Sequence, residues 1–395
     1  MTEARLLPLL VPHDDTLQKC VYCPKLSRAA CPVSTVEASE TVTPWGKMSL
    51  AWFASRGDVP VDAEHAAPAW ACSGCYGCRE RCDHKNEVST VLHDARAEMF
   101  QRGAAPPGAQ RVADAQQVAD RGADIAARTR ALAGGRPAPR PGGAALLVGC
   151  GYLRRAPEVA RDIVSLAEGL LGETPRLISA CCGLPQYGAG DRPGFEASAR
   201  ALLAEVGAAA RLLVADPGCA RALLVEYPRL GLVSTGDARA ARHGAIDLAA
   251  SGGSSAPPRP ELLLDVCSSS SKIGASTRAP QGTVRWHDPC QLGRGLGRFD
   301  EPRALLRRVL GRPAEEFLYH RELATCSGGG AVLPATRPET SRGIADARIA
   351  EHRERGGGTL VTACASSLHR FRSRGEPAVD LHSLLADSLP ERAPT

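Results

Sequence analysis

The stretch CSGCYGCRERC, from Cys72 to Cys82, places four thiols within a short run of chain. Two residues separate each of the first three cysteines from the next, and three residues separate Cys78 from Cys82. Disulfide frameworks, structural zinc sites and iron–sulfur clusters all use closely spaced cysteines. The spacing and its sequence context distinguish between these three kinds of site.

The spacing favours an iron–sulfur cluster. A disulfide framework needs an oxidising compartment, and the start MTEARLLPLLVPHDD lacks the charged region and long apolar core of a signal peptide, so we expect a cytoplasmic protein. Structural zinc usually takes two CxxC pairs from separate loops. The pattern C-x2-C-x2-C-x3-C instead wraps three corners of a cubane [4Fe–4S] cluster, and its fourth cysteine serves a second cluster.

A second cysteine run, CVYCPKLSRAACP, precedes the first and supplies the Cys-Pro ending of the ferredoxin pattern. Its usual third ligand is missing, and Ser27 stands where a cysteine would give the ending C-x3-C-P. We infer that the two runs exchange ligands, and that serine, water or an open position completes the second site. The predicted ligands are Cys72, Cys75, Cys78 and Cys31 for the complete cluster, and Cys20, Cys23 and Cys82, with Ser27 as one candidate fourth ligand, for the other.

Composition narrows the class of protein. A chain of 395 residues is long for a single hydrophobic core, so two or three domains are expected. Fifteen cysteines in an intracellular chain indicate metal binding. The net charge of +5 is modest, and no basic stripe with interleaved aromatic residues is present, so we expect no nucleic-acid partner. No apolar run reaches the ~18 residues of a membrane span. We therefore expect no direct membrane insertion, and any membrane association would run through a partner.

Residues 1–105 are predicted to form an α-helical ferredoxin-like domain that carries both cysteine runs. TPWGKMSLAWFASRGDV has the composition of a helix, and NEVSTVLHDARAEMFQRG places Val88, Val91, Leu92, Ala95 and Met99 on one helical face. A linker with a solvated helix is expected over residues 106–142, because AGGRPAPRPGG closes it with proline and glycine.

Two similar segments follow, predicted as α/β domains at residues 143–255 and 260–395 and joined near SGGSSAPPRP. Each alternates short apolar strand patterns with helical patterns, and in each the order is strand-Cys, helix, Cys-Cys or Cys-Ser with Gly, helix and a further strand. Cysteines at the carboxyl ends of parallel strands lie where such sheets bind ligands. The candidate metal ligands are Cys150, Cys181, Cys182 and Cys219 in the first domain, and Cys290, Cys326 and Cys364 in the second.

Two cluster-binding runs followed by two such domains resemble the cysteine-rich (CCG-domain) iron–sulfur proteins. These include the B and D subunits of heterodisulfide reductase, the iron–sulfur subunits of glycolate oxidase and of lactate utilisation, and the C subunit of anaerobic glycerol-3-phosphate dehydrogenase. The resemblance implies an α+β multidomain fold, with an N-terminal helical ferredoxin module and two tandem α/β CCG domains. It also implies electron exchange with a flavoprotein dehydrogenase or a membrane redox partner.

The sequence departs from the five-cysteine pattern C…CC…CxxC that this family implies. In the first domain, one alignment puts Asp216 at the first cysteine of CxxC, and another puts Cys219 there with Ala222 at the second. In the second domain, Ser327 and Ser367 replace thiols. We expect an iron–sulfur cluster or zinc in the first domain and a weak or empty site in the second.

Two functions remain open from the sequence. The first is an iron–sulfur electron-transfer subunit of an oxidoreductase, which relays electrons between a partner dehydrogenase or a thiol/disulfide substrate and an acceptor. The second is a non-catalytic metal-binding scaffold or redox sensor, because serines remove ligands at three separate places. His287 either contacts a cluster or is a buried structural histidine, and Cys267 is expected to be a buried free thiol.

Overall fold

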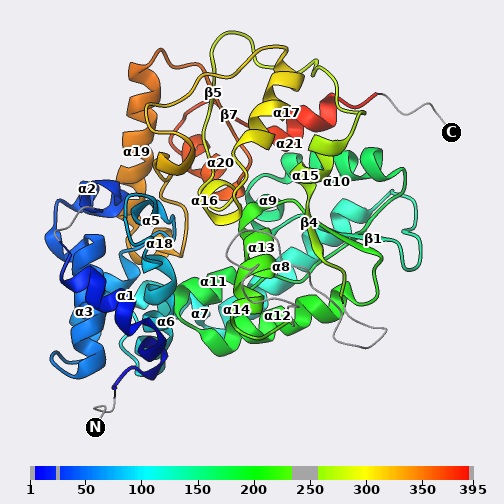
Figure 1. The fold of residues 1–395 in the computed structure, drawn as a ribbon. Coiled ribbons are helices and arrows are strands. Elements are labelled where there is room, and N and C mark those ends of the chain that lie inside the picture. The colour runs from blue at the N-terminus through cyan, green and yellow to red at the C-terminus, as the bar shows by residue number, and fades with distance from the viewer. Residues whose placement is uncertain (1–4, 24–26, 234–256, 391–395) are drawn as a thin grey trace. The chain divides into compact units, whose positions relative to one another are not determined.

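The computed structural model describes residues 5–23, 27–233 and 257–390. Figure 1 shows its helices and strands. The chain divides into two compact units that alternate along the sequence. Unit 1 comprises Met1–Val118, Leu184–Phe195 and Tyr319–Glu351, and unit 2 comprises Ala119–Gly183, Glu196–Leu318 and His352–Thr395. One segment from each CCG-like repeat therefore folds with the N-terminal module. Most of the predicted joining segment SGGSSAPPRP lies outside the described residues.

Unit 1 is built from helices, as predicted for the N-terminal module, and its described residues contain no strand. Helix α3 illustrates the local signals: the Thr43 side chain accepts a hydrogen bond from Gly46 N, Pro44 follows, and the helix stops at Gly57 with φ +83°. The α-helices are α1 (Asp14–Val21), α2 (Pro32–Glu37), α3 (Pro44–Arg56), α4 (Ala63–Ala66), α5 (Gly77–Glu80), α6 (Val88–Gln101), α7 (Pro107–Ala113), α11 (Leu184–Ala189), α18 (Leu333–Thr336) and most of α19 (Pro338–Glu354). Short 3-10 helices are η1 (Pro8–His13), η2 (Arg28–Ala30), η3 (Glu40–Val42), η4 (Ala67–Trp70) and η7 (Arg321–Leu323).

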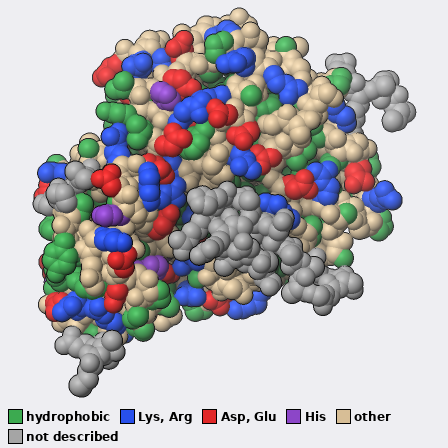
Figure 2. Space-filling view, viewed as in Figure 1, with side chains coloured by type: hydrophobic (Ala, Val, Ile, Leu, Met, Phe, Trp, Pro, Cys, Tyr) green, Lys and Arg blue, Asp and Glu red, His purple; other side chains and the backbone are tan. Residues whose placement is uncertain are grey.

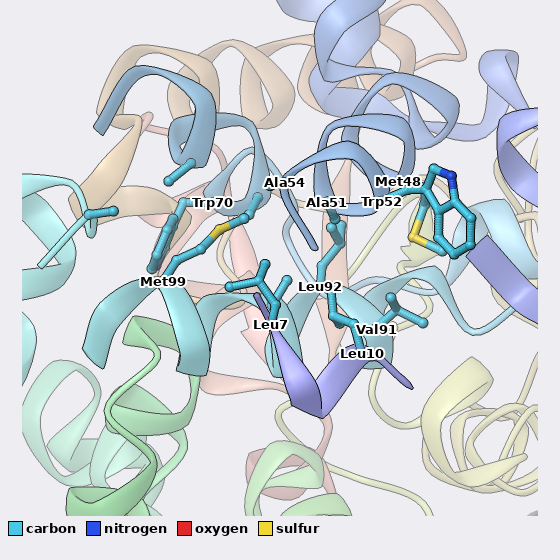
Figure 3. Packing of buried hydrophobic residues seen from close by; sticks show 14 of the residues in the cluster. Leu7, Leu10, Met48, Ala51, Trp52, Ala54, Trp70, Val91, Leu92 and Met99 are labelled. Atoms are coloured by element: carbon cyan, nitrogen blue, oxygen red, sulfur yellow. The ribbon is translucent and has the colours of Figure 1, made fainter. Parts of the chain in front are cut away.

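The core of unit 1 lies between α3, α6 and η1 (Figure 3). Trp70, Val91 and Leu92 are fully buried, and Met48 and Met99 fill the space around them. The five residues predicted for the apolar face of α6 are all buried, and so are most of its other side chains, including Arg96 and Glu98. Ala189 of α11 belongs to the same cluster, so a residue of the first CCG-like repeat completes the core of the N-terminal module.

Unit 2 contains two parallel sheets covered by helices, in agreement with the predicted α/β domains. The first sheet has the order β2-β1-β3-β4 and the second the order β5-β6-β7. The strands are β1 (Ala144–Leu147), β2 (Arg176–Leu177), β3 (Arg211–Val214), β4 (Pro260–Leu262), β5 (Val284–Trp286), β6 (Thr359–Thr362) and β7 (Ala378–Asp380). The helices are most of α8 (Ala115–Ala133), α9 (Cys150–Arg155), α10 (Pro157–Leu171), most of α12 (Arg192–Val206), α13 (Pro217–Arg221), the π-helix η5 (Ala222–Glu226), α14 (Tyr227–Arg229), α15 (Leu263–Ser269), α16 (Gly293–Leu296), α17 (Asp300–Leu310), α20 (Ala365–Arg372) and α21 (Leu381–Asp387). Strand β4 pairs with β3, so the first sheet extends to residue 262.

The two repeats match strand by strand, which decides between the alignments left open by the sequence. Strand β3 ends two residues before Asp216, and α13 begins at the next residue. Strand β6 ends two residues before Cys364, and α20 begins directly after it. Asp216 therefore corresponds to Cys364, and Cys219 corresponds to Ser367. The first repeat therefore keeps only the second cysteine of the CxxC pair, Cys219. The second repeat keeps only the first, Cys364.

The surface carries charges of both signs. On the face drawn in Figure 2, Lys and Arg side chains are intermixed with Asp and Glu. None of the helices in the described part of the chain is both long and apolar enough to cross a bilayer.

Candidate iron–sulfur centres

The four cysteines assigned to the complete cluster line one cavity in unit 1. The cavity holds about 340 Å³ of space free of protein atoms, counting its open mouth. Cys31 and Cys75 are each 8% exposed, and Val88 and Pro44 contribute apolar walls. Four sulfurs around one cavity with apolar walls are the donor set of a cubane cluster. The lining residues are Ala30, Cys31, Pro32, Pro44, Lys47, Cys72, Ser73, Cys75, Tyr76, Cys78, Val88 and Ser89.

Local backbone geometry presents these sulfurs. Cys31 is the N-cap of α2, with Pro32 at the first helical position. The loop from Cys72 turns through Gly74 (φ +66°) and Tyr76 (φ +60°) before α5 begins, and a left-handed conformation is unusual for tyrosine. Gly74 N donates to the sulfur of Cys72 at 3.4 Å. Backbone N–H groups that approach a ligating sulfur are a common feature of cluster loops.

Lys47 of α3 brings a positive charge into the cavity. Its side chain is 2% exposed, and Nζ donates to the sulfur of Cys31 at 3.3 Å. Burial by itself lowers the pKa of a lysine, but the neighbouring Cys31 and Cys72 sulfurs raise the pKa of Lys47 above its usual value. Lys47 was not predicted as a site residue from the sequence, although a lysine among the apolar residues of WGKMSLAW was a usable signal.

Arg96 of α6 holds the backbone of the segment that leads into the Cys72–Cys78 loop. Its guanidinium is fully buried and donates to the carbonyl oxygens of Cys72 (2.8 Å) and Ala69 (2.9 Å). It also donates to Gly188 (3.1 Å) and Ala331 (3.4 Å). The Arg96 side chain therefore joins the segment at Cys72 to both segments that the CCG-like repeats contribute to unit 1, through Gly188 and Ala331. The loop with glycines at 328–330 packs closely against Ser73. A Cβ on Gly330 would lie 2.3 Å from the Ser73 carbonyl oxygen.

Cys20, Cys23 and Cys82 are also neighbours in unit 1. Burial, together with the charges of Cys82 and Cys23, raises the pKa of Cys20 to about 11, while a hydrogen bond from Asn86 opposes this rise. Asn86 Nδ2 lies 3.1 Å from the Cys20 sulfur. Asn86 was not predicted as a site residue from the sequence. Ser27 stands at the start of η2, and residues 24–26, which join it to Cys23, lie outside the described residues.

The four thiols of the first CCG-like repeat form a connected row in unit 2. Hydrogen bonds link the thiol of Cys150 to Cys181, Cys181 to Cys182, and Cys182 to Cys219. The hydrogen bond that the Cys150 thiol donates to Cys181, followed by desolvation, raises the pKa of Cys150 well above its usual value. The predicted ligands of this repeat thus lie together, at the carboxyl edge of the first sheet.

Asp216 lies between this row and Cys364. Its carboxylate accepts hydrogen bonds from Gly218 N (2.9 Å) and Cys219 N (3.4 Å), and also from Ala365 N (3.3 Å), next to Cys364. Desolvation raises the pKa of Asp216. Desolvation and then the charge of Asp216 raise the pKa of Cys364 to about 12, and the Ser367 hydroxyl is hydrogen-bonded to that thiol. The carboxylate and the serine hydroxyl thus both stand beside thiols, where the CxxC pattern has sulfur.

The second repeat divides its three thiols between the units. Cys290 and Cys364 belong to unit 2, whereas Cys326 belongs to unit 1, where Gly328 N donates to its sulfur at 3.2 Å. His287 is 1% exposed and packs edge-to-face on Phe371, with ring centroids 4.9 Å apart, which favours the structural histidine. Cys267 is fully buried in α15.

Within the described ranges, no three His, Cys, Asp or Glu side chains are grouped so as to hold a single metal ion.

Comparison with known proteins gives two matching families. The 4Fe-4S dicluster domain matches residues 16–86, and the cysteine-rich domain matches residues 144–223 and 284–371. Together the matched residues make up more than half of the chain. The dicluster match contains both N-terminal cysteine runs, and the two cysteine-rich matches contain the candidate ligands of both repeats.

The similar curated proteins include components of reductases from methanogens. The D subunit of the dihydromethanophenazine:CoB–CoM heterodisulfide reductase from Methanosarcina mazei is 39% identical over 67 residues, 17% of this chain and 16% of that protein. Its counterpart in Methanosarcina acetivorans is 33% identical over 82 residues, 21% of this chain and 20% of that protein. The match therefore spans a fifth or less of these relatives.

A longer match is the B subunit of the fumarate reductase (CoM/CoB) from Methanothermobacter marburgensis, which is 24% identical over 378 residues, 92% of this chain and 70% of that protein. This alignment runs through the dicluster domain and both cysteine-rich domains of the present chain. With a 4Fe-4S dicluster domain followed by two CCG domains, the chain belongs to the cysteine-rich (CCG-domain) iron–sulfur proteins.

Proposed function

We propose that this chain is the iron–sulfur electron-transfer subunit of an oxidoreductase. It relays electrons between a partner dehydrogenase, for which a flavoprotein is the expected class, or a thiol/disulfide substrate, and an acceptor. The observation that carries the proposal is the cavity lined by Cys31, Cys72, Cys75 and Cys78 with a lysine ammonium at its wall. A bound cluster supplies reversible one-electron transfer.

The residues of the chain hold such a group and tune it. Four cysteines supply the thiolates, the Arg96 guanidinium holds the Cys72 carbonyl in place, and Pro44 and Val88 limit access of water. The second N-terminal site uses Cys20, Cys23 and Cys82, with Asn86 donating to Cys20. A third centre is proposed at the thiol row of the first CCG domain, and an iron–sulfur cluster is favoured there over zinc, because no three His, Cys, Asp or Glu side chains of the described residues are grouped so as to hold a single metal ion.

The names of the relatives support a reductase complex as the setting. One is a subunit of a heterodisulfide reductase and another is a subunit of a fumarate reductase. We propose that this chain likewise works with partner subunits, and that any membrane association runs through them.

The test is iron content and electron paramagnetic resonance on protein purified without oxygen. Cys75→Ser is expected to lose about four irons per chain, since one cubane is removed. Cys267→Ser is the matched control, because Cys267 is a fully buried thiol outside every proposed site. Iron content that is the same in wild type, Cys75→Ser and Cys267→Ser would exclude the cluster assignment, as would zinc at equal occupancy in the wild type.

A second function is favoured by the substituted ligand positions of the CCG domains. Asp216 and Ser367 stand where a complete CxxC pair has thiols, and the Ser367 hydroxyl binds the Cys364 thiol. A metal-binding scaffold or redox sensor that has lost the chemistry at these sites has this arrangement. Such a protein would bind iron, but its reduced clusters would not be reoxidised by added disulfide or quinone acceptors. The reduced clusters of an electron-transfer protein would be reoxidised by them.

A further inference from the structure

The ammonium of Lys47 is a buried charge whose counter-charge is sulfur. Nζ donates to Cys31 at 3.3 Å and lines the same cavity as Cys72 and Cys78. In the part of the chain that the structure describes, Lys47 forms no ion pair with a carboxylate. Two described lysines do form ion pairs with carboxylates. Lys19 pairs with Asp15 and Lys85 with Glu80, and both lysines lie on the surface.

An uncompensated buried ammonium is costly, so a side chain of this kind persists where a negative group offsets it. Neutral thiols do not provide that charge. Four thiolates around an oxidised cubane leave a net negative charge, and one-electron reduction adds a further negative charge. A nearby cation therefore stabilises the reduced form more than the oxidised form, and it does so strongly because the site is shielded from water.

We propose that Lys47 sets the potential of the Cys31–Cys72–Cys75–Cys78 centre: its fixed positive charge raises the reduction potential and makes this centre the place where an arriving electron is held. The inference rests on the proposed function, because it requires a cluster in this cavity. The electron comes from a low-potential donor, which is oxidised as the cluster is reduced, and no bond is made or broken. The neighbouring site differs, since Cys20 receives a hydrogen bond from the neutral amide of Asn86.

The experiment is a dithionite titration, in the presence of redox mediators, of iron-loaded full-length protein, followed by electron paramagnetic resonance. Lys47→Met is expected to lower the equilibrium constant for reduction of this centre tenfold or more. For one electron, a tenfold change lowers the midpoint potential by about 59 mV. Lys47→Arg, which keeps the charge, should restore most of the shift. Lys85→Met is the matched control, since its side chain is 60% exposed and its charge is screened by water.

Lys47→Gln separates charge from hydrogen bonding, because the amide still donates but is neutral. A potential near that of Lys47→Met supports the charge, whereas a wild-type potential in either neutral variant overturns the inference. If both neutral variants lose iron and Lys47→Arg keeps it, the requirement for charge is supported. Loss of iron from Lys47→Arg as well would count against it. Wild-type protein without iron would overturn the proposed function, and a loaded wild type with no shift in Lys47→Met overturns this inference alone.

Iron-free protein gives a readout independent of the cluster. Without thiolate charge around it, the buried ammonium is a liability, so iron-free Lys47→Met should unfold at the same temperature as iron-free wild type or higher. A lysine with only a structural role would give the opposite result, a lower unfolding temperature in the iron-free variant.

Discussion

The side-chain amide of Asn86 donates to the sulfur of Cys20 at 3.1 Å, across 66 residues of sequence. Asn86 is 6% exposed, and its Nδ2 also donates to the Thr16 carbonyl at 3.3 Å. The amide therefore ties the segment that follows Cys82 to α1, the helix that carries Cys20. A donor to a ligand sulfur stabilises negative charge on that sulfur.

Asn86→Leu should weaken the Cys20–Cys23–Cys82 site selectively. Removing a hydrogen bond to a charged group costs about 1.5–3 kcal/mol, so the midpoint potential of this site should fall and its iron should be lost more readily. Redox titration followed by electron paramagnetic resonance measures both effects. The signal of the Cys31–Cys72–Cys75–Cys78 centre is the internal control, and equal shifts in both signals would contradict a local role for Asn86.

Ser27→Cys should increase the iron content of the same site. A site with three thiolates is expected to be labile, and a thiolate at the fourth position binds iron better than a serine oxygen does. Iron analysis should show higher occupancy, and the potential of the site should fall. An unaltered iron content and signal would mean that residue 27 does not face the metal.

Cys181→Ala and Cys326→Ala should differ in their effect on metal content. Cys181 lies in the row of four thiols, so its loss should remove metal from the first CCG domain and lower stability, because bound metal stabilises the fold that binds it. Ser327 and Ser367 leave the second repeat with three thiols, so loss of Cys326 should cost little metal. Total iron and zinc on both variants measure this, and equal metal loss from the two would refute the asymmetry.

Tyr152→Phe should destabilise unit 2. The Tyr152 hydroxyl donates to Asp380 Oδ2 at 2.8 Å, and both side chains are fully buried. The variant leaves a buried carboxylate oxygen without this donor, at a cost of about 1–3 kcal/mol in the free energy of unfolding. Urea unfolding measures the change. Tyr22→Phe is the matched control, since Tyr22 is 82% exposed and the stability of this variant should be that of the wild type.

The sequence predicts the elements more fully than their assembly. The helix α6, the alternation of strands and helices, and the association of Cys31 with the later cysteine run all follow from spacing and periodicity, because these signals are local or carried by thiols. The sequence did not decide how the two incomplete CxxC pairs align. The ends of β3 and β6 decide it, because they place Asp216 at the position that Cys364 has in the second repeat.

Lys47, Arg96 and Asn86 could not be placed from the sequence. Each acts across a long separation: Arg96 reaches the carbonyls of Gly188 and Ala331, and Asn86 reaches Cys20. A buried polar side chain is recognised by what surrounds it, and periodicity contains no information about partners from distant segments. The split of the second repeat between the two units was hidden for the same reason.

The contribution of segments 184–195 and 319–351 to unit 1 has a consequence for biosynthesis. The hydrophobic core of the N-terminal module includes Ala189, and Arg96 needs a carbonyl from residue 331. As the chain leaves the ribosome, the cysteine-bearing helices emerge long before these partners, so the module stays incomplete until most of the protein has been translated. We therefore expect any cluster bound by Cys72, Cys75 and Cys78 to be assembled late, when the remainder of the chain is present.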